Sequence, residues 1–290
     1  MAVTGKVRAT LSCALVLACA SALTLVLPVA QAGAATCPAS PAFVNGCLEV
    51  PATGVGNSDL PAANAGSPTP GIGWSTDDPG AVLEIWQAGF DGVPADSGSQ
   101  FVEINANAQD TLTQDVATVP GSTIRWHLAH RGRDGTDVME VRLGPPGGPL
   151  VAQVPDGQVG TSISDGNTAW GHYTAVYTVP AGQTTTRFAM ASISETTAPS
   201  FGNFLDSVSV ELLPTAADDT ATTTPGHSIA IPVLANDCGL GLTVHAVGAV
   251  AHGAAVKSGT SIKYTAAATF VGTVTFTYTL FVALSTFLPM

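Results

Sequence analysis

Hydrophobic and polar residues alternate with a period of two along most of the chain after about residue 40. Clear runs occupy residues 124–131, 139–143, 173–178 and 208–212. Clusters of Gly, Pro, Asn and Asp separate these runs, and no window sustains a helical period of 3.6. Short alternating strands between turn residues are typical of antiparallel sheets packed face to face. The pattern therefore predicts an all-β protein.

The composition changes after Leu213. Residues 214–226 are rich in Thr, Pro, Ala and Asp, which predicts a linker leading into a first edge strand. Beyond it, apolar residues alternate with Thr over 273–280, which is typical of a strand with one buried face. Residues 227–290 are predicted to form a second, smaller β-sandwich. Its apolar end, 281–290, is shorter than the ~20 residues of a membrane helix, the alternative for this segment. It indicates a truncated or altered carboxyl terminus and an imperfectly closed sandwich.

The first 34 residues have the order of a secretory signal peptide. Lys6 and Arg8 precede an apolar stretch over 11–30, and small residues follow up to Ala34. An uncleaved membrane anchor is the alternative, but Pro28 and several Ala and Ser residues favour cleavage. We therefore expect a secreted, extracellular protein, either free or associated with the cell surface, without stable membrane insertion after the signal is removed.

Length and charge indicate the number of modules and exclude one kind of partner. A chain of 290 residues is typical of two modules, and its 46% hydrophobic content is sufficient for packed cores. Loss of Lys6 and Arg8 with the signal leaves seven basic residues against 21 acidic ones. Such a surface repels phosphate backbones, so nucleic acid is excluded as a partner. In an oxidising compartment, Cys37 and Cys47 are expected to form a disulfide.

The terminal unit contains four characteristic pieces: Ala-Asp-Asp-Thr at 217–220, Ile-Pro-Val-Leu-Ala-Asn-Asp at 231–237, Ala-His-Gly at 251–253 and Phe-Thr-Tyr-Thr at 276–279. On these residues it resembles bacterial immunoglobulin-like or cadherin-like repeats of secreted and surface proteins. These pieces cover about residues 216–280, in the order of the family. The resemblance implies an immunoglobulin-like sandwich that acts as a spacer or an adhesion repeat.

The larger unit, residues 37–213, contains Val-Asn-Gly-Cys-Leu-Glu at 44–49, Gly-Ser-Gln-Phe-Val-Glu at 98–103, His-Arg-Gly-Arg at 130–133 and Gly-Asn-Phe-Leu-Asp-Ser-Val at 202–208. On these residues it resembles secreted galactose-binding-like jelly rolls related to carbohydrate-binding modules. The resemblance implies a jelly-roll β-sandwich that binds a carbohydrate or a cell-wall polymer. In the resembled modules, acidic residues placed like Glu49 and Asp206 help to hold a structural calcium ion. Ordinary surface carboxylates are the alternative for this pair.

The candidate ligand-binding residues are aromatic and basic. All four tryptophans lie in the larger unit, and an aromatic face suits the apolar face of a sugar ring. Trp126 shares an apolar strand face and is predicted to lie in the core. The binding candidates are Trp74, Trp86, Arg131, Arg133 and Trp170. For the arginines, a bridge network with carboxylates such as Glu84 and Glu103 is the competing interpretation.

No enzyme motif of known spacing is present in the sequence. The leading interpretation is a secreted, non-enzymatic binding protein, in which the first module recognises a carbohydrate or another extracellular ligand. One alternative is a structural or adhesive surface protein without a saccharide pocket. A polysaccharide hydrolase with an unrecognised carboxylate pair is the weaker alternative.

Overall fold

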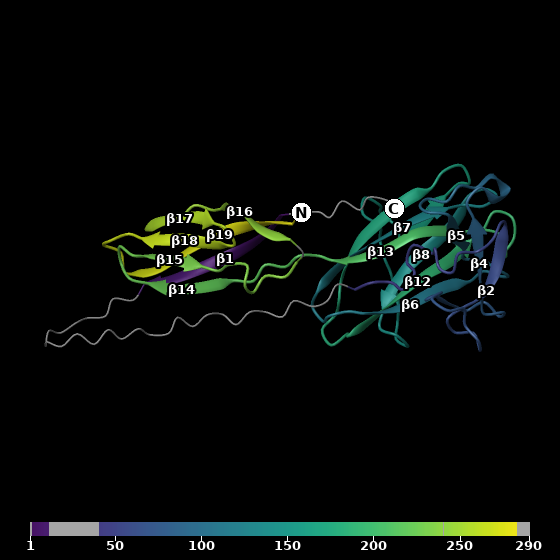
Figure 1. The fold of residues 1–290 in the computed structure, drawn as a ribbon, viewed down its shortest axis with the longest axis horizontal. Helices are drawn as coiled ribbons and strands as arrows, with labels where there is room; N and C mark the ends of the chain where they lie inside the picture. The colour runs from purple at the N-terminus through teal and green to yellow at the C-terminus, as the bar shows by residue number, and fades with distance from the viewer. Residues whose placement is uncertain (1, 12–40, 240, 283–290) are drawn as a thin grey trace. The chain divides into compact units, whose positions relative to one another are not determined.

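The computed structural model describes residues 2–11, 41–239 and 241–282, which form two compact units (Figure 1). The larger unit comprises residues 41–213, and the smaller unit comprises residues 2–11 and 214–282. In the described ranges every regular element is a β-strand, apart from one short 3-10 turn, η1 (Phe90–Gly92). The predicted all-β class is confirmed. No helix in these ranges is long and apolar enough to cross a membrane.

Two antiparallel sheets build the larger unit. The first has the order β10-β8-β12-β6-β3, with β9 paired to β8. Its strands are β3 (Ser75–Thr76), β6 (Thr111–Ala117), β8 (Asp137–Gly144), β9 (Val151–Ala152), β10 (Ser162–Asp165) and β12 (Thr185–Ser194). The second has the order β11-β7-β13-β5-β4-β2. Its strands are β2 (Asn57–Pro61), β4 (Val82–Gln87), β5 (Gln100–Glu103), β7 (Thr123–Arg131), β11 (Gly171–Thr178) and β13 (Phe204–Leu212).

The main core of the larger unit contains apolar side chains from both sheets, including Trp126, Met139 and Phe188. Strand β7 shows why the sheets pack, because Ile124, Trp126 and Leu128 are buried at every second position. A separate apolar cluster consists of Trp86, Val93, Phe101 and Phe204. Consecutive residues of β4 and β5 are buried, which indicates that these two strands are covered on both faces.

The smaller unit also has two sheets. One has the order β14-β1-β19-β16, with β1 (Ala2–Leu11), β14 (Asp219–Thr223), β16 (Leu242–Val247) and β19 (Gly272–Val282). The other has the order β15-β18-β17, with β15 (Ser228–Ile231), β17 (Gly253–Ser258) and β18 (Ser261–Ala266). In β19, Val274, Phe276, Tyr278 and Leu280 enter the core between threonines, as the alternation predicts.

The amino-terminal segment differs from the sequence-based expectation. Residues 2–11 form β1 in the smaller unit, where β1 pairs with β14 on one side and β19 on the other. Strand β1 therefore lies inside this sheet, between β14 and β19. The rest of the predicted signal peptide, residues 12–34, lies outside the described residues, as do Cys37 and the apolar end from 283 to 290.

The predicted disulfide between Cys37 and Cys47 is not formed, since Cys47 is a free, exposed thiol. Its position follows from the local turn. The backbone N–H of Leu48 donates to the Asn45 carbonyl at 3.1 Å, and the Leu48 side chain is fully buried in the main core. The turn therefore directs Leu48 inward and leaves Cys47 at the surface.

Candidate functional site

The second sheet of the larger unit carries a polar surface on the face opposite the main core. His127 on β7 lies opposite Thr174 on β11 and Ser209 on β13 in the strand register. One row along, Arg125 lies opposite Glu211. Because side chains alternate along β7, the strand that buries Trp126 presents Arg125 and His127 on the other side. Polar groups from three neighbouring strands therefore share one surface.

A pocket of about 200 Å³ opens in this surface. Its lining residues are His127, Leu128, His172, Tyr173, Thr174 and Ser207. They belong to β7, β11 and β13, so a rigid sheet positions the pocket. We call it the β7–β11 pocket.

Asp96 fixes two of the polar groups in the β7–β11 pocket. Its Oδ1 lies 2.7 Å from His172 Nε2, and its Oδ2 accepts a 2.7 Å hydrogen bond from Ser207 Oγ. The His172 side chain is 68% exposed, whereas that of Asp96 is 14% exposed. The imidazole is therefore available at the surface while a shielded carboxylate holds it.

Thr174 supplies a polar atom of a different kind. Its Oγ1 is buried and has no hydrogen-bond partner within the protein. A buried hydroxyl without a partner costs free energy. The pocket thus offers an imidazole and hydroxyl groups that can bind small polar groups.

A hydrogen-bonded network lies next to the β7–β11 pocket. Tyr173 Oη donates to Asp165 Oδ2 at 2.8 Å, and the same oxygen lies 2.8 Å from His130 Nδ1. The other ring nitrogen of His130 lies 2.9 Å from Asn203 Oδ1. Burial, followed by the interaction with Asp165, raises the pKa of Tyr173, so its hydroxyl stays protonated. The network fixes the strand that lines the pocket.

Trp170 precedes β11 and is half-buried. Its indole Nε1 donates to the Pro94 carbonyl at 2.9 Å, and its ring packs edge-on against Phe101 with 5.4 Å between centroids. Trp170 is not a lining residue of the β7–β11 pocket. Both Trp170 and Pro94 are two residues away in sequence from the contacting pair His172 and Asp96. Of the three tryptophans predicted to bind ligand, it is the one with substantial exposure.

The structure corrects the expected exposure of Trp74 and Trp86, which are 0% and 1% exposed. Trp74 stacks on Phe43 at 5.2 Å, and its Nε1 donates to the Asn45 carbonyl at 3.0 Å. Gly73 adopts a φ of +73°, which lets the loop turn the indole into the core. Trp86 contacts Phe101 and Phe204 in the separate cluster. Neither ring has a face available to a sugar.

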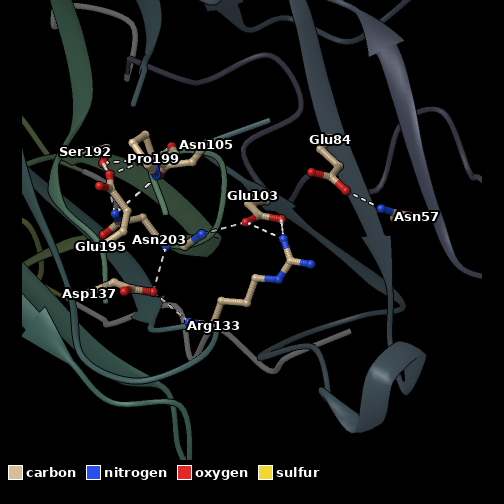
Figure 2. Close-up of polar contacts among 11 residues, drawn as sticks. Asn57, Glu84, Glu103, Asn105, Arg133, Asp137, Ser192, Glu195, Pro199 and Asn203 are labelled. Atoms are coloured by element: carbon tan, nitrogen blue, oxygen red, sulfur yellow. Dashed lines mark hydrogen bonds and ion pairs between the residues drawn. The ribbon is translucent and has the colours of Figure 1, made fainter. Parts of the chain in front are cut away.

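Arg133 is part of a largely buried bridge (Figure 2). Its Nη1 donates to both carboxylate oxygens of Glu103 at 3.0 Å. Its guanidinium lies over the rings of Trp86 and Phe201, at 4.7 and 4.0 Å from their centroids. The Gly202 N–H adds a 2.6 Å hydrogen bond to Glu103 Oε1. The geometry is that of a bridge network, the competing interpretation for this arginine.

Two carboxyl groups lie side by side in this region, because Glu84 on β4 is paired with Glu103 on β5. Burial, together with the charge of Glu84, raises the pKa of Glu103 to about 8, although Arg133 opposes the shift. Burial also raises the pKa of Glu84, which accepts a hydrogen bond from Asn57 (Figure 2). Glu103 is fully buried, so this pair acts within the structure, and burial favours the protonated form of both carboxyl groups by raising their pKa values.

Arg131 is 8% exposed and therefore does not form an open rim. Its Nη2 donates to the Asn167 carbonyl. Burial lowers the pKa of its guanidinium, and its Nε has no partner within the protein. Most of this side chain is thus enclosed by the loop that precedes β11.

The two predicted calcium ligands contact one loop. Glu49 accepts hydrogen bonds from the backbone N–H groups of Ser99 and Gln100, at 2.9 and 3.1 Å. Asp206 accepts from the N–H groups of Asp96 and Ser97, at 2.9 and 3.0 Å. Burial raises the pKa of Asp206 to about 7.

The described ranges contain no group of three or more His, Cys, Asp or Glu side chains placed to hold a metal. Calcium takes about six to eight oxygen ligands and also uses carbonyls and water, so the two carboxylates supply a partial set. Calcium binding at Glu49 and Asp206 stays a prediction.

Sequence reasoning missed most of the β7–β11 pocket. The alternation over 124–131 predicts a polar face that includes His127, but it does not single out His172, Asp96 or Ser207. A usable signal exists for His172, since it continues the polar face that Thr174 begins in the alternating run. The sequence does not show that this run pairs with 123–131, which brings the two histidines to one pocket.

Comparison with known proteins describes the two units separately. Residues 212–281 match the bacterial Ig domain family. No curated protein sequence matches the chain. Among solved structures, the CBM22-2 xylan-binding domain from Paenibacillus barcinonensis is 14% identical, with a TM-score of 0.35, and covers 54% of this chain and 98% of its own.

A xylan-binding domain of carbohydrate-binding-module family 22 is 15% identical, with a TM-score of 0.36, covering 48% of this chain and 86% of its own. A Stig cyclase from Fischerella sp. TAU is 13% identical, with a TM-score of 0.40, covering 61% and 98%. The larger unit is a sandwich of two antiparallel sheets, and the smaller unit that follows it matches the bacterial Ig domain family over residues 212–281, as the sequence predicts.

Proposed function

We propose that the larger unit binds carbohydrate and that the β7–β11 pocket is the binding site. The observation that carries this proposal is the lining of the pocket. An exposed imidazole held by Asp96 lines one open cavity together with Thr174 and Ser207. Sugars present hydroxyl groups that both donate and accept hydrogen bonds, so they match such a lining.

The proposed ligand is a saccharide of a cell wall or another extracellular polymer. A pocket of about 200 Å³ accommodates a small part of a chain, and its openness leaves the polymer free to continue over the sheet. Trp170, in the sequence next to β11, supplies an aromatic surface for further contact. Binding here is proposed to occur without bond cleavage, and the protein is proposed to be exported, with the smaller unit as a spacer or adhesion repeat.

The test is a glycan-array screen of the whole protein, followed by calorimetric titration with the best saccharide. His172→Ala and Thr174→Val should each weaken binding by about tenfold, because each removes one polar group from the lining of the pocket. Arg187→Ala is the matched control. It breaks an exposed ion pair with Asp115 on the other sheet, so it should leave affinity unchanged.

Each of the competing interpretations predicts a different result. A structural or adhesive protein without a saccharide pocket would bind no glycan. A hydrolase would release reducing ends from the polysaccharide it binds. Equal affinity in the wild type, His172→Ala and Thr174→Val would place the binding site elsewhere.

A further inference from the structure

The smaller unit contains a position for a strand that the amino-terminal segment fills. In the sheet order β14-β1-β19-β16, strand β1 is the element between β14 and β19. All ten residues of β1 pair antiparallel with β19, from Ala2 opposite Phe281 to Leu11 opposite Gly272. Five of them also pair in parallel with β14. The hydrogen bonding of both neighbouring strands therefore depends on β1.

Val7 anchors β1 in the core. It is fully buried and belongs to the core cluster of the smaller unit, with Ala221, Val274 and Phe276. In the register it lies opposite Phe276 on β19 and Asp219 on β14. Strand β1 thus supplies both backbone pairing and an apolar side chain to the smaller unit.

The same ten residues carry Lys6 and Arg8, the basic residues of the predicted signal peptide. Export with signal cleavage would therefore remove β1. Strands β14 and β19 would then face each other across a gap, with unpaired N–H and C=O groups along both edges. The core would also lose the side chain that Val7 contributes. Such a gap is suited to an added strand.

We infer that the gap between β14 and β19, here called the strand slot, is a peptide-binding site. Its ligand is an extended segment of about ten residues with an apolar side chain at the position of Val7. Residues 2–11 are the occupant in the unprocessed chain, and cleavage opens the slot to an extended peptide of the same chemistry. The opening of the slot by cleavage rests on the proposed export, whereas the occupation of the slot by residues 2–11 rests on the strand pairing alone.

The test uses the whole chain and the processed form, residues 35–290. The probe is a fluorescent synthetic peptide with the sequence of residues 2–11. The processed form should bind the peptide in a 1:1 ratio, as measured by fluorescence anisotropy. Hydrogen exchange should slow in 219–223 and 272–282, because the added backbone pairs with both edges. The whole chain, whose slot is filled, should bind the peptide much more weakly.

Two altered peptides separate specific from general binding. Val7→Asp places a carboxylate in the core position and should weaken binding at least about tenfold. Ala9→Pro removes a backbone N–H from the ladder and should weaken it similarly. In the whole chain, Val7→Asp should expel β1 and make the slot available to the wild-type peptide.

Removal of residues 2–11 could leave the smaller unit of the processed form unfolded, and the experiment still tests the strand slot in that case. Recovery of exchange protection in β14 and β19 on adding the peptide supports the strand slot, since folding is then coupled to binding. Absence of binding, equal binding of a scrambled peptide, or protection confined to other strands overturns it. These readouts involve no saccharide, so they test the strand slot independently of the proposed carbohydrate binding at the β7–β11 pocket. Intact mass of the exported protein tests cleavage itself.

Discussion

At the scale of single residues, the larger unit combines few basic groups with many acidic ones. Burial determines which of these groups form ion pairs and how far their pKa values are shifted. Arg133 is held between Glu103 and two aromatic rings, which stabilises a bridge in the interior. Its partner, Glu103, has a pKa raised to about 8 from the ordinary 4.5. The folded state therefore binds a proton that the unfolded state releases at lower pH.

This shift predicts a pH dependence of stability. The stabilisation from proton binding at Glu103 is fully present below about pH 4.5 and is lost as the pH rises through about 8. Across this window the free energy of unfolding should fall by up to about 1.4 kcal/mol per pH unit. Glu103→Gln should remove this part of the slope. The measurement is urea unfolding followed by tryptophan fluorescence, since all four tryptophans lie in the larger unit.

Asp206 also has a raised pKa and contributes to the pH dependence of stability. The contribution of Glu103 is therefore the difference between the stability–pH profiles of the wild type and of Glu103→Gln. Parallel profiles for the wild type and Glu103→Gln would show that Glu103 titrates normally in the folded state.

Residue-level function was the hardest part to predict from sequence. Trp126 was assigned to the core because its neighbours at every second position are apolar, and it is fully buried. Trp74 follows a loop glycine, where periodicity carries no information, and its side chain enters the core through the left-handed turn at Gly73. A loop side chain can point into the core or into solvent, and for Trp74 the packing against Phe43 determines the direction.

At the scale of elements, strands were predictable and their partners were not. Alternation located β7 and β19 within a residue or two, since one face of each packs on a core. The neighbours of β7 are β11 and β13, which are distant in sequence. Because the β7–β11 pocket forms where these strands meet, its histidines could be placed on strands but not brought together.

The loop at 96–100 is the element that joins Glu49 and Asp206, and calcium is proposed to bind there. We expect the melting temperature of the larger unit to rise by about 5 °C or more at a calcium concentration about 100 times Kd, compared with excess chelator. The Glu49→Gln and Asp206→Asn double variant should show no such rise. Tryptophan fluorescence during heating is the measurement. Superimposable melting curves with calcium and with chelator would contradict the proposal that calcium binds at this loop.

At the scale of the whole molecule, the chain forms two units with separate apolar cores. Separate cores predict separate unfolding transitions. Phe276, which is 3% exposed, contributes to the core of the smaller unit alone. Phe276→Ala should lower the stability of that unit by about 3–5 kcal/mol.

Scanning calorimetry should show one transition moved to lower temperature, while the fluorescence transition of the larger unit stays in place. Thr277→Ala, at the exposed neighbouring position of β19, is the control and should shift neither. A shift of both transitions by Phe276→Ala would show that the two units unfold together.

The pairing of Ala2 with Phe281 also determines when the protein can finish folding during its synthesis. Residues 41–213 are contiguous, so the larger unit can form as soon as it has left the ribosome. Residues 2–11 are translated first, yet β19, their main partner, emerges only after nearly all the described chain has been made. Throughout that interval residues 2–11 lack their main partner strand. In the proposed export, Lys6 and Arg8 would therefore be recognised, and the segment cleaved, before β1 can pair with β19.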